Sequence, residues 1–416
     1  MTVQTIEHHK PYTLRFFKLP ISDKIQLTAL LYLTIWVSSP FLAYGSTYRL
    51  LAFASIFVWI LVELFRKNNI FIKPPLYLIL TLFFIFYTTL ISYNVDGISA
   101  INRNIQFYMM LFFIFIYASY ERRSLYLLKP IVYINIILFT LWTVTTYKGL
   151  LIDPHASRYV IKSNAYARQL MQQGVGGFAF IYSLLIYNIA VLALLRYKYL
   201  KYKKFSIFTY FLIFSVGISS LVILKAGYSI AVILWVLSMV FFFFYSQNPI
   251  KNIFLLFFIV VLYFFLQSYL LDMLKLLYNS IDQGAYRLKL GDIISSMEIG
   301  KVTGTAADRV ERYMRSLMIF MEHPIMGIWR IAPIGKHSLV LDTFAQYGFF
   351  MGIILVYILL KIPFDLYIRT KKAKALSVTI LALAILLISL NNVAMLYGFM
   401  LYLFYPYVMK ELSSYQ

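Results

Sequence analysis

The chain has 416 residues, of which 62% are hydrophobic and only 13% are charged, and its mean hydropathy is +0.77. Ordinary soluble domains are about 25% charged, so this class is excluded and an all-α polytopic membrane protein is predicted. The 38 Lys and Arg residues outnumber the 16 Asp and Glu residues. They lie in short turns between apolar runs, which favours a lipid bilayer over nucleic acid as the partner. The lack of cysteine excludes disulfides and thiolate chemistry.

Twelve apolar segments are candidates to cross a bilayer, for which about 20 residues are needed. They cover residues 25–44, 50–65, 75–92, 105–119, 127–146, 174–195, 205–224, 228–245, 253–271, 348–367, 375–390 and 393–409. The first lacks a small-residue cleavage site, so we interpret it as a retained span and not as a signal peptide. The sequence therefore predicts about 12 transmembrane helices.

A long polar interval, residues 272–347, separates the ninth and tenth segments. We divide the chain into residues 1–271 (helices 1–9), this loop, and residues 348–416 (helices 10–12 and a tail). Within the loop, Thr305-Ala-Ala-Asp308 resembles a helix capping box. An apolar run with helical period follows it and stops at His323-Pro324, which predicts a short amphipathic helix. The run comprises Val310, Met314, Leu317 and Met321.

Lys and Arg in short loops favour the cytoplasmic side of a membrane. With the N-terminus placed in the cytoplasm, 22 of the 38 basic residues face that side. Of the other 16, nine lie in residues 272–347 and four in residues 147–173, which are long enough to weaken the rule. Both termini are therefore predicted to be cytoplasmic and the loop 272–347 extracytoplasmic.

Two smaller external regions carry unusual positive charge. The segment 147–173 holds Lys148, Arg158, Lys162 and Arg168 with a single acid, Asp153, which predicts an anionic ligand. Lys225 stands in a short external turn near membrane depth, where an ionisable group is a functional candidate. The alternative is that its side chain only extends to the membrane surface.

The amphipathic helix of the loop carries three arginines. Arg312 and Arg315 follow Asp308 and Glu311 at i,i+4, so they either stabilise the helix surface or bind a ligand. Arg309 has no such acid. Pyrophosphate recognition favours the bidentate guanidinium group, which makes Arg309 and Arg312 the preferred candidates, with Arg315 and Arg330 as further ones.

His337 precedes the helix that leads into the tenth segment. The positive end of the helix dipole is expected to lower its pKa and to leave a neutral imidazole as a general base near pH 7. The alternative is a histidine that merely lies at the membrane interface, and this structural interpretation is favoured for His155 and His323. The acids of the loop are scattered singly and no nucleotide or zinc motif occurs, so neither a metal nor a cofactor is expected.

About 100 residues of the C-terminal half resemble the superfamily of integral-membrane O-antigen ligases and Wzy-type polysaccharide polymerases. The resemblance rests on the arginine helix 309–315, Glu322-His-Pro-Ile-Met-Gly327, His337-Ser338 and Tyr347-Gly-Phe-Phe-Met-Gly352, with a weaker likeness at Arg168 and Gly174-Val-Gly-Gly. Two departures are a wider glycine spacing, Gly348 to Gly352, and the lack of an arginine at the eighth segment, where Lys225 is nearby.

The resemblance implies an inverting, metal-independent glycosyltransferase that acts on undecaprenyl-pyrophosphate-linked sugars outside the bacterial cytoplasmic membrane. It implies catalytic roles for His337, Arg309 and Arg312. The substrate-binding candidates are Arg168, Lys225, Arg330 and Arg315. Implied partners are lipid-linked oligosaccharide donor and acceptor, membrane lipids, a chain-length regulator and a flippase.

Three functions stay open at this point. A polymerase extends a second lipid-linked repeat unit, and we favour it. An O-antigen ligase transfers the glycan to lipid A core instead. The third is a non-enzymatic flippase or transporter of the same lipid-linked sugars, for which internal repeats and broken helices would be expected.

Overall fold

The computed structural model describes most of the chain. The described residues are 19–43, 46–96, 105–121, 128–160, 164–202, 206–244, 271–280, 285–299, 304–329, 334–335, 337–369, 374–390 and 394–413, with isolated positions between 251 and 269. Every regular element in these ranges is a helix, which confirms the predicted all-α class.

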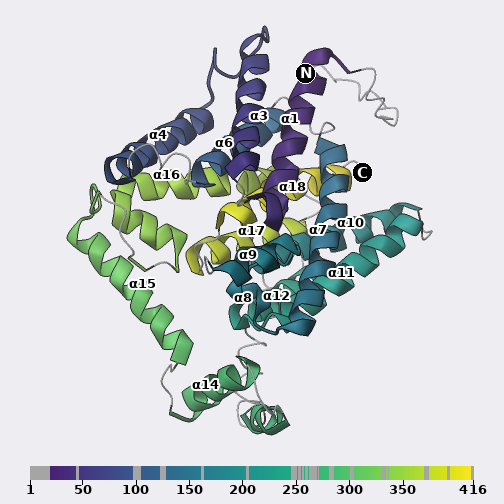
Figure 1. Ribbon diagram of the computed structural model, residues 1–416, viewed down its shortest axis with the longest axis vertical. Coiled ribbons are helices and arrows are strands. Elements are labelled where there is room, and N and C mark those ends of the chain that lie inside the picture. The colour runs from purple at the N-terminus through teal and green to yellow at the C-terminus, as the bar shows by residue number, and fades with distance from the viewer. Residues whose placement is uncertain are drawn as a thin grey trace.

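Eleven of the twelve predicted apolar segments correspond to helices in the described ranges (Figure 1). They are α1 (Ile21–Ser38), α3 (Ser46–Leu64), α4 (Leu76–Asp96), α6 (Ile105–Glu121), α7 (Leu128–Ile152), α10 (Phe178–Tyr202), α11 (Ile207–Lys225), α12 (Ser229–Phe244), α16 (Leu339–Arg369), α17 (Lys374–Leu390) and α18 (Ala394–Ser413). The ninth segment, 253–271, falls almost entirely outside the described residues. Short helices α2 (Pro40–Ala43), α8 (Ala156–Tyr159) and α9 (Ala165–Gln172) lie between the long ones.

Six helices of the described chain are long and apolar enough to cross a membrane. They are Thr47–Leu64, Leu76–Asn94, Leu128–Ile152, Phe178–Tyr199, Ile207–Lys225 and Leu339–Ile368. Shorter apolar stretches lie in α6, α12 and α17. The coarse prediction of a helical membrane protein is therefore confirmed, while the count of twelve spans stays a prediction.

Two helices form the centre of the bundle. α18 packs against α10, α6, α16 and α17, and α10 packs in addition against α11 and α12. Every residue from Met400 to Met409 is buried. A helix that is apolar all round is one that its neighbours enclose, so α10 and α18 form the core against which the other helices pack.

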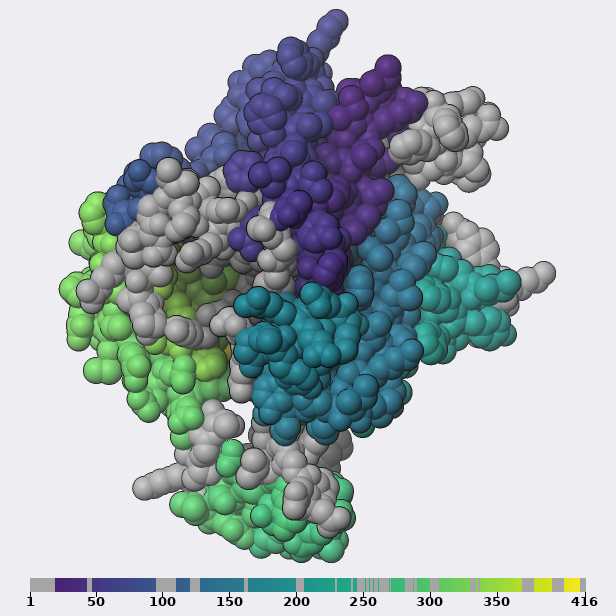
Figure 2. Space-filling view, in the orientation of Figure 1, coloured from purple at the N-terminus to yellow at the C-terminus, as the bar shows by residue number. Residues whose placement is uncertain are grey.

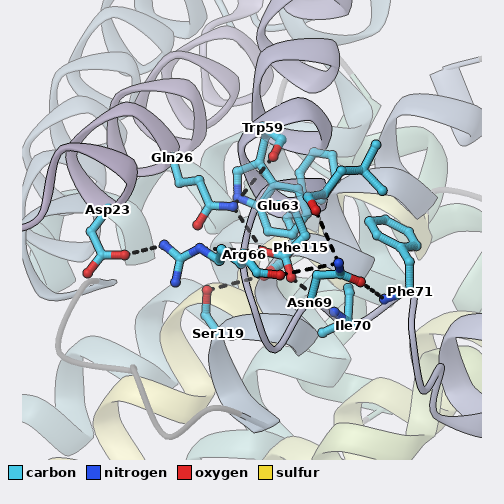
Figure 3. A network of polar contacts seen from close by, with 11 residues as sticks. Asp23, Gln26, Trp59, Glu63, Arg66, Asn69, Ile70, Phe71, Phe115 and Ser119 are labelled. Carbon is cyan, nitrogen blue, oxygen red and sulfur yellow. Dashed lines mark hydrogen bonds and ion pairs between the residues drawn. The ribbon is translucent and has the colours of Figure 1, made fainter.

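A network of polar contacts joins the ends of α1 and α3 (Figure 3). Glu63 is fully buried, and its carboxylate accepts hydrogen bonds from Gln26 Nε2 and from the backbone N–H of Ile70, both at 3.1 Å. Arg66 Nε lies 3.7 Å from the same carboxylate, and the Arg66 guanidinium also forms an ion pair with Asp23. Because a buried carboxylate is costly without partners, this network holds the turn after α3 in place.

Two helices of the polar interval lie at the edge of the bundle. α14 (Ala285–Ile299) and α15 (Gly304–Glu322) extend downward from α16 in Figure 1, and the green residues of α15 and early α16 form the left edge in Figure 2. α15 ends directly before His323-Pro324, as predicted. It begins at Gly304, so Thr305 lies inside the first turn, and the prediction of Thr305 as the cap residue was wrong.

Candidate active site

α15 is an amphipathic helix that turns its polar side toward the protein. Tyr313 donates a hydrogen bond from its hydroxyl to the carbonyl of Leu390 in α17 (2.9 Å), and Ser316 is buried against α16. At about 100° per residue, Arg309 and Arg312 lie on the same side of the helix as these two anchors. The packing of α15 therefore directs both arginines inward, where the surface of the helix is partly covered.

Backbone contacts fasten the turn after α15 to the break in α16. Ile328 and Trp329 donate hydrogen bonds to the carbonyls of Ala345 and Gln346, both at 3.1 Å, and Phe349 donates one to the carbonyl of Pro324 at 2.8 Å. These three hydrogen bonds hold the turn that follows α15 against the break in α16. We call this pairing of the turn 323–329 with residues 345–349 the clasp.

Two glycines make the clasp possible. Gly327 has φ +65°, and Gly348 has φ +79° and ψ −176°, a backbone region that is almost restricted to glycine. A Cβ at Gly327 would collide with the backbone of Gln346, and a Cβ at Gly348 would collide with the carbonyl of Ile325. The phrases Glu322-to-Gly327 and Tyr347-to-Gly352 in the sequence thus contain residues needed for one close backbone approach.

A buried carboxylate positions the segment that carries His337. Asp342 Oδ1 in α16 accepts hydrogen bonds from Ser316 Oγ of α15 (2.7 Å) and from the backbone N–H of Gly335 (3.2 Å). Ser338 Oγ accepts the N–H of Leu341 (3.1 Å) and so caps α16 at the residue after His337. The segment that carries His337 is therefore fixed between α15 and the start of α16.

The structure brings together the three residues predicted to be catalytic. The pKa of His337 is lowered from its ordinary value of 6.5, first by burial and then by the positive charges of Arg309 and Arg312, while Asp308 opposes the shift weakly. The predicted direction is the same, but its main cause is burial, followed by the two guanidinium groups, instead of the helix dipole. A half-buried neutral imidazole beside two cations results.

Neither arginine is neutralised by a carboxylate within the described part of the chain. Asp308 does not pair with Arg312, although the i,i+4 spacing allowed it, whereas Arg315 pairs with Glu311 at 2.9 Å on the exposed surface. Nη1 of Arg309 is buried and has no hydrogen-bond partner among these residues. Two inward guanidinium groups without carboxylate partners form a site suited to an anion.

A row of aromatic side chains extends from the site toward the segment that follows α7. The Arg309 guanidinium interacts with the hydroxyl of Tyr182 in α10. The ring of Tyr182 lies 5.9 Å from that of Tyr228, and both pack against Phe178. Arg158 lies over the ring of Tyr228, with its Cζ 5.4 Å from the ring centre. Two arginines therefore flank one tyrosine pair.

Arg158 is a site residue that the sequence did not single out. Its Nη2 donates to the carbonyl of Gly227 (3.0 Å), and its buried Nε has no hydrogen-bond partner among the described residues. The sequence showed that Arg158 lies in a basic loop together with Arg168. No local pattern indicated that Arg158, rather than Arg168, would lie at the site.

The other predicted binding residues are not joined to this cluster by contacts among the described residues. Arg168 is exposed on α9, and Lys225 is half-buried at the end of α11, two residues before the carbonyl that Arg158 contacts. Arg315 takes the surface pairing that was its alternative interpretation. Arg330 lies outside the described residues.

No group of three or more His, Asp or Glu side chains in the described ranges is arranged to hold a metal ion. Metal independence stays a prediction that only an assay tests. No family model matches the chain, and no curated protein is significantly similar to it.

Proposed function

We propose that this protein is an inverting, metal-independent glycosyltransferase of the Wzy type. It would transfer a glycan from undecaprenyl pyrophosphate to the sugar of a second lipid-linked repeat unit. The observation that supports this proposal most is that Arg309 and Arg312 turn inward beside half-buried His337 without a carboxylate partner among the described residues, and that Nη1 of Arg309 is buried without a hydrogen-bond partner there. An anion-binding pair of guanidinium groups beside a neutral imidazole matches the needs of a donor that leaves as pyrophosphate and an acceptor that must lose a proton.

The chemical step divides between these side chains. The acceptor oxygen forms a bond to the anomeric carbon from the face opposite the pyrophosphate, and the anomeric carbon–oxygen bond to the pyrophosphate breaks. The pyrophosphate leaves with the electron pair, and Arg309 and Arg312 stabilise its growing charge. His337 accepts the proton of the acceptor hydroxyl. Arg158, at the far side of the tyrosine pair, adds positive charge for the donor phosphates.

The proposal includes a topology. Twelve spans would place both termini in the cytoplasm and α15 on the outer side of the bacterial cytoplasmic membrane, where lipid-linked repeat units are exposed. Lys and Arg are more frequent in the loops that this topology places on the same side of the membrane as the N-terminus, which supports the orientation. A chain-length regulator and a flippase are the protein partners that such a function would require.

The deciding experiment incubates the purified protein in lipid nanodiscs with lipid-linked repeat units and follows glycan length by gel electrophoresis. We expect longer glycans, and we expect the same rate after EDTA treatment. Transfer only when lipid A core is supplied would identify a ligase. Absence of transfer to either acceptor would reject the proposal that the protein is an enzyme and would leave the transporter as the remaining function. Loss of activity with EDTA and its recovery with Mg²⁺ or Mn²⁺ would reject metal independence.

A further inference from the structure

The outward surface of α15 carries a continuous apolar stripe. Its side chains recur at helical spacing and are among the more exposed apolar side chains of the protein. They are Val310 (50% exposed), Met314 (49%), Leu317 (36%), Met318 (57%) and Met321 (70%). At about 100° per residue, the five side chains occupy an arc of about 100° on one side of the helix.

The amphipathicity of α15 is inverted relative to that of a helix on a soluble protein. Such a helix buries its apolar stripe against the core and exposes its charges. α15 instead turns Arg309, Arg312 and Ser316 inward and leaves the stripe uncovered. Exposed apolar patches of this kind mark contacts with another apolar phase, so the stripe requires an occupant.

The stripe is followed by exposed apolar side chains on α16, a helix long and apolar enough to cross a membrane. The turn after α15 carries the exposed side chains of Ile325 and Met326. The hydrogen bonds of the clasp hold this turn next to the break in α16 at Gly348. After this break α16, whose apolar stretch Leu339–Ile368 is long enough to cross a membrane, continues with Phe349 and Phe350, which are 47% and 64% exposed. Exposed aromatic side chains on a spanning helix face acyl chains, so one apolar surface runs from the span onto α15.

Charged residues border the stripe on one side only. Glu311, Arg315, Glu322 and Asp308 follow it around the helix, and all four are exposed. The circumference of α15 is thus divided into an apolar sector, a charged sector and a protein-facing sector. This is the pattern of a helix that lies in the plane of a membrane interface, with its apolar side inserted by about 5–10 Å and its charged side in water.

We propose that α15 is an interfacial helix whose apolar stripe is inserted among the acyl chains of the bilayer beside α16. The occupant of the stripe is therefore lipid. If the proposed function is correct, this position holds Arg309 and Arg312 at the depth of lipid phosphates, so a lipid-linked donor could reach them by lateral diffusion.

The test uses the natural lack of cysteine, which allows a single spin label to be placed by one substitution. Met314→Cys and Arg315→Cys are a matched pair, since the two residues are adjacent and similarly exposed, at 49% for Met314 and 53% for the Arg315 side chain, but point about 100° apart. In nanodiscs, we expect the label at 314 to collide mainly with oxygen dissolved in the bilayer. The label at 315 should collide mainly with a water-soluble nickel chelate.

Two outcomes would overturn the proposal. Preferential collision of both labels with the nickel chelate would place the stripe in water. Protection of the label at 314 from both reagents would mean that protein covers it, and dipolar broadening between labels would identify a second copy as that protein. Because the measurement involves no sugar transfer, it can succeed where the proposed function fails, and the reverse also holds.

Discussion

At the scale of single residues, the burial of His337 between two arginines gives a prediction about pH. Its folded-state pKa is lowered below 6.5, so the imidazole stays neutral and able to accept a proton down to pH values below 6.5. We expect the acidic limb of the kcat/KM profile to be centred below pH 6.5. An acidic limb centred above 6.5 would contradict this assignment.

The stability linked to the same group should be complete above pH 6.5 and decline as the pH falls, because the unfolded chain takes up the proton first.

Replacement of His337 should remove catalysis and leave the fold intact. General-base catalysis contributes roughly 10²- to 10⁴-fold, so His337→Ala should lose activity on that scale with little change in unfolding temperature. His337→Lys should not restore it, because a protonated amine cannot accept the proton. The control is His323→Ala, in the exposed turn before Pro324, which should act through local structure. Near-normal rates for His337→Ala would show that acceptor activation has another source.

Three arginines on α15 form a matched series. Arg309→Ala or Arg312→Ala should weaken donor binding by about 2 kcal/mol, as expected for the loss of a charge-assisted contact. Arg315→Ala removes only an exposed i,i+4 pair with Glu311, which is worth a few tenths of a kcal/mol. Initial rates as a function of lipid-linked donor concentration measure the difference. Equal effects for Arg312 and Arg315 would show that the inward orientation of Arg312 has no part in binding.

At the scale of elements, the clasp depends on the backbone of Gly348. Gly348→Ala should destabilise the protein by at least about 2 kcal/mol, because its φ and ψ are almost restricted to glycine and a Cβ would meet the Ile325 carbonyl. Gly217→Ala in α11 is the control, since no atom lies within 4 Å of its added Cβ and a helix interior gains roughly 0.5–1 kcal/mol from alanine. Thermal unfolding in detergent distinguishes them, and equal unfolding temperatures would contradict the described backbone.

The α1–α3 network predicts a second stability effect. Glu63→Ala leaves the Ile70 N–H without its acceptor and Gln26 with only the longer bond to the Trp59 carbonyl (3.4 Å). It should cost about 3 kcal/mol, the low end of the range for buried pairs because Arg66 is 26% exposed. Glu63→Gln keeps one acceptor oxygen and should cost less. Glu311→Ala, which removes an exposed partner, should cost only a few tenths of a kcal/mol. A Glu63→Ala protein as stable as the parent would show that Glu63 is not needed.

At the scale of the whole molecule, the proposed topology is open to a direct test with single cysteines. Lys67 and Arg168 are both exposed, and the topology places them on opposite sides of the membrane. A membrane-impermeant maleimide should label Arg168→Cys in intact cells. It should label Lys67→Cys only after permeabilisation. Labelling of both positions in intact cells would reject the topology, and with it the extracytoplasmic position of α15.

Local patterns in the sequence determined the class of fold and most of its elements. Apolar runs of about 20 residues predict helices because backbone polar groups must be satisfied internally in lipid. The end of α15 at His323-Pro324 was equally local. The sequence also named His337, Arg309 and Arg312 as candidates, because they lie in the long polar interval 272–347 and match the residues that carry the family resemblance.

Only the tertiary structure decided how these residues are arranged. Whether Arg312 or Arg315 pairs with its acid depends on which side of α15 packs against α16 and α17, and helical period alone leaves that side undefined. Arg158 joins the site through Tyr228 and Tyr182, which are distant in sequence. The enclosure of α10 and α18 and the exposure of the α15 stripe follow from the same cause, because the burial of an apolar face depends on the neighbouring elements, and their positions are long-range properties of the chain.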